Sequence, residues 1–106
     1  MSMFHTATKV TIIAERLLQD GIVNILEADG AKGYTVVDGA GKGQHFKRAS
    51  DRASVVSAFS IIRIEVIFTE RERAEKVARD VADKFFGQYS GVVHLSQVEV
   101  LRPERF

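Results

Sequence analysis

The stretch FSIIRIEVIFTERERAEKVARDVADKFFG, residues 59–87, places a strand pattern directly before a helix pattern. At its start, apolar side chains alternate with a second set that includes Arg63 and Glu65. This two-residue period is typical of a β-strand with one buried face, and it predicts a strand over residues 59–68. The predicted buried face consists of Ile62, Ile64, Val66 and Phe68.

The second half of the same stretch predicts an amphipathic helix. Thr69 followed three residues later by Glu72 is a capping-box pattern, which predicts the helix start. Gly87 follows the last apolar turn and predicts the helix end. Between these signals runs an apolar stripe at three- and four-residue spacing, which we expect to face the core. The stripe consists of Ala74, Val77, Ala78, Val81, Ala82, Phe85 and Phe86.

The rest of the chain adds three strands and one more helix. The short β-branched run VTIIA predicts a strand over residues 10–14. From Glu15 onward, apolar residues recur at helical spacing until Gly30, where a glycine can take the left-handed conformation that ends a helix. YTVVD at residues 34–38 predicts the second strand, and residues 92–101 predict the last one.

The predicted order is strand, helix, strand, strand, helix, strand, which corresponds to an α+β, ferredoxin-like βαββαβ fold. A chain of 106 residues has the length of one domain, which we assign to residues 1–106. Residues 39–58, between the second and third strands, are rich in glycine and small residues and have no sustained period. We expect a loop there, and loops of this length inside compact domains are usually functional.

The composition excludes several classes of function. Fifteen Lys and Arg stand against fourteen Asp and Glu, so the net charge of +1 gives no strong field for duplex nucleic acid. Cysteine is absent, which excludes disulfides, thiolate metal sites and a thiol redox response. The sequence shows no signal peptide and no apolar run long enough to span a bilayer. We therefore expect a cytoplasmic protein that does not insert into the membrane.

One face of the predicted sheet remains uncovered, because two helices can cover only the other face. The uncovered face carries Ile61 and Ile67 together with Arg63 and Glu65. Self-association would bury its apolar area and let its charges pair across an interface, which favours an oligomer. The alternative is a monomer with a half-polar face in contact with water, as antiparallel sheets often have.

The start of the long loop is the segment most suited to binding a ligand. Three glycines leave backbone amides free to approach phosphate oxygens, and basic side chains surround them. These residues are Gly39, Gly41, Gly43, Lys42, His45, Lys47 and Arg48. The segment is neither a Walker loop nor a dinucleotide fingerprint. From spacing alone, it is either a phosphate site or a loop whose charges are solvated.

Three segments resemble the SbtB proteins, a PII-like family of cyanobacterial inorganic-carbon control within the PII superfamily. The segments are GYTVVDGAGKGQ at residues 33–44, FTERERAEKVARDVADKFFGQYSGVV at residues 68–93 and VEVL at residues 98–101. The resemblance covers most of the chain and implies a homotrimer whose subunit clefts bind adenine nucleotides. It also implies that residues 39–58 are the family's T-loop. Many members end in a Cys-Gly-Pro-x-Gly-Cys tail, and the cysteine-free sequence resembles a variant without it.

The resemblance also implies which residues bind the nucleotide. The base of the T-loop, where amides and polar side chains face the phosphate, corresponds to Gly39, Gly41, Lys42, Gly43, Gln44, His45 and Arg48. The strand that passes the base and ribose corresponds to Val36, Val37 and Asp38, and the segment that contacts the adenine edge corresponds to Gly91, Val92 and Val93. The implied ligands are cyclic AMP, AMP, ADP and ATP, with or without a divalent cation, and no resident cofactor.

The implied partner is the sodium-dependent bicarbonate transporter SbtA, which would recruit the protein peripherally to the membrane. The loop has small side chains, mixed charge and no apolar stripe, so we expect its conformation to depend on the bound nucleotide. Its tip, with Phe46 as the one large apolar residue, would dock into the transporter. The expected partner-binding residues are Gln44, His45, Phe46, Lys47, Arg48 and Arg52.

Two other classes of function share some of these features. An RNA-recognition domain has the same strand order but needs stacking aromatics on its central strands, and residues 62–68 lack that pattern. A slow ATP or ADP phosphohydrolase is the enzymatic alternative, because bound ATP with a divalent ion invites hydrolysis. The sequence shows no nucleophile–base pair and no metal-ligand set, so we predict a binding protein without catalytic residues.

Overall fold

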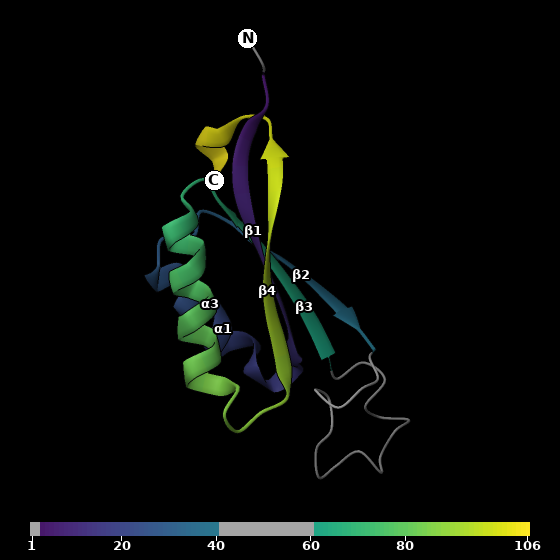
Figure 1. Ribbon diagram of the computed structural model, residues 1–106. Helices are drawn as coiled ribbons and strands as arrows, with labels where there is room; N and C mark the ends of the chain where they lie inside the picture. The colour runs from purple at the N-terminus through teal and green to yellow at the C-terminus, as the bar shows by residue number, and fades with distance from the viewer. Residues whose placement is uncertain (1–2, 41–60) are drawn as a thin grey trace.

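The computed structural model describes residues 3–40 and 61–106. In this part of the chain, four strands form one antiparallel sheet in the order β2-β3-β1-β4, with two helices packed on it (Figure 1). The elements are β1 (His5–Glu15), a 3-10 turn (Arg16–Leu18), α1 (Gln19–Ala28), β2 (Thr35–Gly39), β3 (Ile61–Phe68), α3 (Arg71–Phe85), β4 (Gly91–Val100) and a 3-10 turn (Pro103–Arg105). This order confirms the predicted α+β, ferredoxin-like βαββαβ fold.

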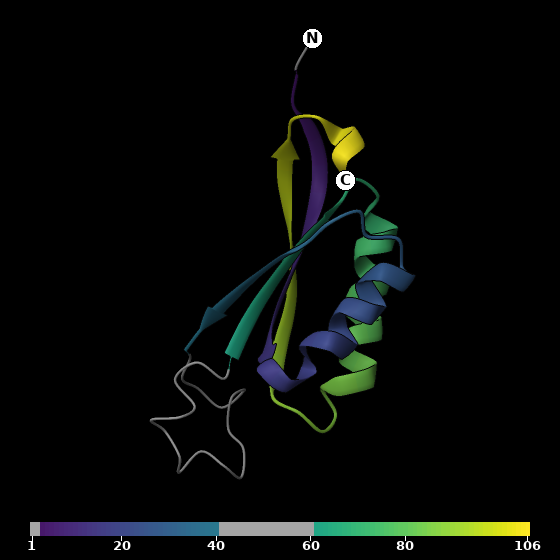
Figure 2. The same ribbon diagram turned by 180° about the vertical axis from the view of Figure 1, so that it is seen from behind.

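Both helices lie on one face of the sheet, as the two opposite views show (Figures 1 and 2). The alternating positions predicted on β3 are buried, together with Val10, Ile12 and Ala14 of β1. The helices contribute the apolar stripes that close this core, which include Ile22 and Leu26 of α1 and Ala74, Val77 and Val81 of α3. The side chains that recur every two residues on the strands and every 3.6 residues on the helices therefore pack together in one core.

The other face of the sheet carries no helix, and its residues form ladder rows across the strands. One row joins Val37, Arg63, Ile13 and Val92, because Val37 pairs with Arg63, Arg63 with Ile13 and Ile13 with Val92. In this row Val37 is 42% exposed, and Ile13 and Val92 are half-buried. We call this surface the open face. It has the mixed apolar and charged character that the sequence predicts for the uncovered side.

The predicted boundaries of β1 and α1 are wrong by several residues. β1 begins at His5 rather than at residue 10, because His5 and its neighbours pair with the C-terminal half of β4. The strand also continues through Glu15, which the sequence analysis places at the helix start. A 3-10 turn separates it from α1, which begins at Gln19. Tertiary pairing thus outweighs the local helical spacing.

The two predicted helix-end signals have different outcomes. Gly30 has a positive φ of 88°, which confirms the left-handed stop after α1. The capping box at the start of α3 is wrong, because the N-cap residue is Glu70 and no side chain caps the helix. The residue pattern fitted the motif, but the chain stays extended for one residue more than the pattern requires.

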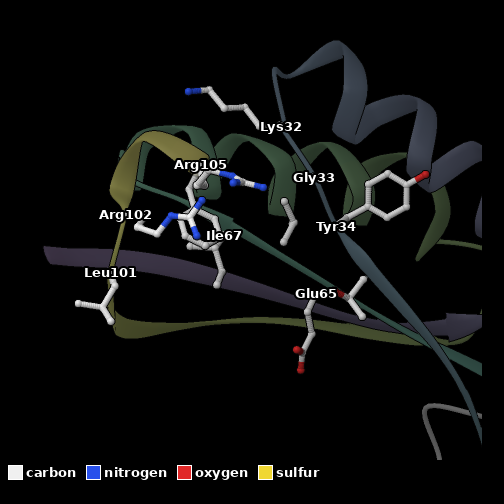
Figure 3. A pocket seen from close by; sticks show the side chains of 11 residues that line it. Lys32, Gly33, Tyr34, Glu65, Ile67, Leu101, Arg102 and Arg105 are labelled. Atoms are coloured by element: carbon white, nitrogen blue, oxygen red, sulfur yellow. The ribbon is translucent and has the colours of Figure 1, made fainter. Parts of the chain in front are cut away.

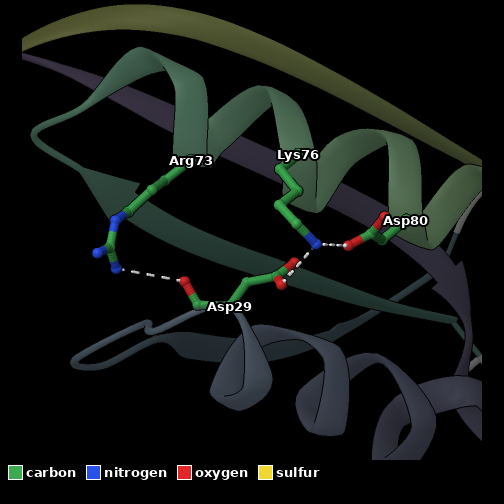
Figure 4. Close-up of polar contacts among 4 residues, drawn as sticks. All are labelled: Asp29, Arg73, Lys76 and Asp80. Carbon is green, nitrogen blue, oxygen red and sulfur yellow. Dashed lines mark hydrogen bonds and ion pairs between the residues drawn. The ribbon is translucent and has the colours of Figure 1, made fainter.

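The end of α1 is joined to α3 by a polar network (Figure 4). Nζ of Lys76 donates to Oδ1 of Asp29 at 3.1 Å and to Oδ2 of Asp80 at 2.8 Å. Nη1 of Arg73 lies 3.5 Å from the carbonyl oxygen of Asp29. Cations from α3 therefore face the C-terminal, negative end of the α1 dipole, which fixes the helix layer.

None of the helices in residues 3–40 and 61–106 is long and apolar enough to cross a membrane.

Candidate functional site

The loop end of the sheet, where β2 stops and β3 begins, carries part of the predicted site. Val37 and Gly39 lie on the open face, while Val36 and Asp38 lie on the face toward the helices. Val36 packs against the core, whereas Asp38 is exposed. Of the other residues predicted for the site, Gly41, Lys42, Gly43, Gln44, His45 and Arg48 lie outside the described residues, as do Phe46, Lys47 and Arg52 of the predicted partner loop.

A small cavity opens at this loop end. Its volume is about 190 Å³, and its lining includes Val37, Asp38, Gly39, Ile61 and Arg63. Pockets that enclose small-molecule ligands usually exceed roughly 300 Å³. The described residues at this end therefore form only part of a ligand site, because a nucleotide is larger than this cavity.

An ion pair and a hydrogen bond connect the segments that meet at the loop end. Nη2 of Arg16 lies 2.7 Å from Oδ1 of Asp38, which ties the turn after β1 to the end of β2. Glu15 is 6% exposed, and its Oε2 accepts a hydrogen bond of 3.0 Å from the backbone amide of Ser90. The ends of β1, β2 and the segment before β4 are therefore fixed relative to one another.

The predicted adenine segment lies at the same end of the sheet but on its opposite edge. Gly91, Val92 and Val93 begin β4 and pair with the last residues of β1. A side chain at Gly91 would meet the ring of Phe86 and the carbonyl oxygen of Ile13, so glycine is required there for packing. Because β3 and β1 lie between β2 and β4, the two predicted segments are about 14 Å apart in one chain.

A second cavity, which the sequence analysis did not predict, lies at the other end of β3 (Figure 3). Its volume is about 500 Å³. Three cationic side chains line it, Lys32 from the segment after α1 and Arg102 and Arg105 from the segment after β4. Its other lining residues include Tyr34, Glu65, Ile67, Leu101 and Phe106. We call this cavity the cation pocket.

The cation pocket could not be found from sequence spacing. Lys32 and Arg102 are seventy positions apart and belong to no motif. They come together because Lys32 precedes β2 and Arg102 follows β4, and the sheet places these two strands on either side of β3 and β1. Guanidinium groups bind phosphate and carboxylate groups well, so the pocket suits an anionic ligand group.

The family described as nitrogen regulatory protein P-II matches residues 7–105 of this chain. Among solved structures, a PII-like signaling protein from Thermus thermophilus is 28% identical, with a TM-score of 0.77 over 97% of each chain. CPII from Thiomonas intermedia bound to ADP, AMP and acetate is 27% identical, with a TM-score of 0.79 over 97% of this chain and 96% of CPII. CPII bound to ADP and bicarbonate is 28% identical, with a TM-score of 0.78 over the same shares.

Proposed function

Because the chain belongs to the nitrogen regulatory protein P-II family, we propose that it is a PII-like signalling protein that binds adenine nucleotides between its subunits. The family match over residues 7–105 is the observation that carries this proposal. It is supported by CPII, a neighbour of similar fold and length that binds ADP and AMP. Within the family, the sequence resemblance favours an SbtB-like member.

The proposed assembly is a homotrimer of single PII-like domains. Trimers are typical of the P-II family. The open face supports self-association, because Ile13, Ile67, Val92 and Val98 on it are only half-buried in a single chain. Light scattering should report three chains per particle, and a monomer at micromolar concentration would contradict the assembly.

We propose that each nucleotide site combines the loop end of one subunit with the cation pocket of a neighbour. Contacts around a three-fold axis are heterologous, so different surfaces of the two subunits meet. The loop-end cavity, at about 190 Å³, is too small alone, and the cation pocket supplies the charges that phosphate needs. Arg102 and Arg105 of one subunit would then contact phosphate groups held at the neighbour's T-loop base.

The remaining roles follow the family pattern. The phosphate groups would contact the backbone at Gly39, Gly41 and Gly43 and the side chains of Lys42, Gln44, His45 and Arg48. Val36, Val37 and Asp38 would lie along the base and ribose, and Gly91, Val92 and Val93 would contact the adenine edge. Calorimetry with ADP, AMP, ATP and cyclic AMP, each with and without Mg²⁺, tests the ligand class. No heat of binding with any of the four would contradict the proposed function.

We propose that residues 39–58 form the T-loop and transmit the nucleotide state to the bicarbonate transporter SbtA. Bicarbonate is also a ligand of the neighbour CPII, which supports a link to inorganic carbon. Deleting residues 46–55 should leave the trimer and nucleotide binding intact while abolishing co-purification with SbtA. Unchanged binding to SbtA would assign the contact to another surface, and no binding by the full chain would point to another partner.

The protein is therefore proposed to be a binding protein and not an enzyme. A slow ATP or ADP phosphohydrolase is the alternative, and a turnover assay separates the two. Release of phosphate from ATP at a rate above that of the Arg48→Ala variant would favour the enzyme.

A further inference from the structure

The carboxylate of Glu15 is buried at the end of an apolar strand. Glu15 is 6% exposed, and Ile12 and Ala14, which precede it on β1, belong to the core. A buried carboxylate loses its hydration, and only hydrogen bonds or cations offset that cost. An apolar side chain would fill the same position without it. The carboxylate is therefore explained by the group that it holds and not by packing.

Glu15 accepts a hydrogen bond from the amide just beyond a backbone ladder. The register between β1 and β4 ends at the pair of Ala14 and Gly91. One residue farther, Oε2 of Glu15 accepts a hydrogen bond of 3.0 Å from the backbone amide of Ser90. Hydrogen bonds to ionised groups are roughly twice as strong as those between neutral groups. The side chain thus continues the link between the two strands beyond their last ladder pair.

The turn that contains Ser90 joins α3 to β4 and lies beside the end of β1 (Figures 1 and 2). Amides earlier in this turn donate back to α3. Those of Gln88 and Tyr89 both donate to the carbonyl oxygen of Phe85, at 3.2 and 2.9 Å. The turn is therefore anchored to the helix on one side and, through Glu15, to β1 on the other.

The residues directly after Ser90 are those to which the proposed function assigns the adenine edge. Gly91 lies against the ring of Phe86 and the carbonyl oxygen of Ile13, so its position is fixed from the α3 side and from β1. The hydrogen bond from Ser90 to Glu15 fixes the peptide group that comes immediately before it. The direction of the backbone groups at residues 91–93 therefore depends on this bond.

We propose that Glu15 is a positioning residue, which sets the direction of the backbone at residues 90–91 and thereby the selectivity of residues 91–93 for adenine over guanine. Adenine presents a donor amino group beside an acceptor nitrogen, whereas guanine presents an acceptor oxygen beside a donor N–H. A backbone segment held in one orientation pairs with one base and leaves polar groups unpaired with the other. This role rests on the proposed nucleotide function, and it adds a determinant of base selectivity that does not itself contact the ligand.

Two substitutions at position 15 separate the hydrogen bond from the size of the side chain. Glu15→Gln keeps an acceptor oxygen at nearly the same place, and Glu15→Ala removes it. Glu15→Ala should lower the ratio of ADP affinity to GDP affinity at least about tenfold, the factor that corresponds to one hydrogen bond to a charged group. Glu15→Gln should keep this ratio within about threefold of that of the unmodified chain. Calorimetry with ADP and with GDP measures both affinities.

Val77→Ala is the matched control for a loss of stability. Val77 is buried in the core, eight residues before the end of α3. The substitution should lower the free energy of unfolding and leave the ratio of ADP affinity to GDP affinity unchanged. An equal fall of the ratio in Val77→Ala would overturn the positioning role, because destabilisation alone would then explain the effect.

Amide exchange without nucleotide tests the positioning itself. The amide of Ser90 should exchange about tenfold faster in Glu15→Ala than in the unmodified chain or in Glu15→Gln, which NMR can resolve. Unchanged exchange at Ser90 in Glu15→Ala would overturn the role and assign any loss of binding to direct contact between Glu15 and the ligand. If the unmodified chain binds neither ADP nor GDP, the proposed function fails and the positioning role with it. Tight ADP binding with a preserved ratio in Glu15→Ala would overturn the positioning role alone.

Discussion

The two ends of the sheet carry their charges in opposite ways. At the loop end, Arg16 is paired with Asp38 at 2.7 Å, and the buried carboxylate of Glu15 accepts a hydrogen bond from the backbone amide of Ser90. At the other end, Arg102 and Arg105 line a cavity in which the described residues leave them without a carboxylate partner. Among the described residues, one end therefore holds its charges in fixed pairs, and the other leaves cations open to an anion. This difference is what suggests that they are halves of one site on neighbouring subunits.

The largest effect is expected at the cation pocket. The double variant Arg102→Ala/Arg105→Ala should lower ADP affinity on the order of 100-fold or more, because hydrogen bonds to charged groups contribute about 1.5–3 kcal/mol each. Calorimetry measures the change. Arg79→Ala is the matched control, since it removes an exposed arginine of α3 whose nearest carboxylate contact, to Glu75, is 3.8 Å. Equal loss in the control would mean that net charge alone attracts the nucleotide.

Two glycines of the predicted site should differ in their contribution to stability. A Cβ at Gly91 would overlap the ring of Phe86 and lie 3.0 Å from the carbonyl oxygen of Ile13, whereas nothing lies within 4 Å of one at Gly39. Gly91→Ala should therefore lower the free energy of unfolding by about 1–3 kcal/mol through overpacking. Gly39→Ala should change it by less than about 0.5 kcal/mol. Urea denaturation of both variants measures this, and equal effects would contradict the close packing at β4.

The ion pair of the loop end should have a smaller effect. Asp38→Asn removes the partner of Arg16, and both side chains are about half exposed, so the free energy of unfolding should fall by about 0.2–1 kcal/mol. The difference from the unmodified chain should shrink at high salt, because mobile ions screen exposed charges. A loss that persists at roughly 1 M salt would show that the pair is not a surface ion pair.

Lys76 and Asp80 of the helix layer make the stability of the fold depend on pH. The hydrogen bond to Asp80, then that to Asp29, raises the pKa of Lys76, and the hydrogen bond from Lys76 lowers the pKa of Asp80. The raised pKa of Lys76 stabilises the fold below its ordinary value of 10.5 and the effect is lost at higher pH. The lowered pKa of Asp80 stabilises it above its ordinary value of 3.8, and this is lost as the pH falls further.

This pH dependence of the free energy of unfolding is the smallest effect that we predict. Both groups are exposed, so unfolding free energy should be nearly flat between these limits and fall gently outside them. Lys76→Met should weaken the dependence at both limits, which urea titrations across the pH range can measure. An equally strong dependence in Lys76→Met would place its origin outside this network.

Much of the fold could be predicted from the sequence because its periods are local. The alternation on β3 and the stripe on α3 depend on neighbours within one element, and both are confirmed. The start of β1 at His5 could not be predicted, because it depends on pairing with Val100 at the far end of the chain. The capping box failed for a related reason, since residue pattern alone does not fix where the backbone leaves the strand.

Only one of the two cavities is lined by residues that the sequence analysis assigned to the site. The glycine-rich segment and its family resemblance pointed to Val37, Asp38 and Gly39, which do line a cavity. Lys32 and Arg105 have no signal in the sequence, because the topology alone brings them to one pocket. The left-handed backbone of Arg102 is also set by the path of the chain and not by residue type.

A subunit-mixing experiment tests the central claim, that one nucleotide site uses two chains, most directly. One variant carries Arg102→Ala/Arg105→Ala and the other carries Arg48→Ala, so that each binds ADP weakly alone. Trimers refolded from an equal mixture should regain tight ADP binding in about one quarter of their clefts, in which an intact loop end faces an intact cation pocket. Calorimetry gives both the affinity and the fraction of sites. Tight binding in about a quarter of the sites is the predicted result, and no recovery of tight binding in the mixed trimers would contradict a site shared between subunits.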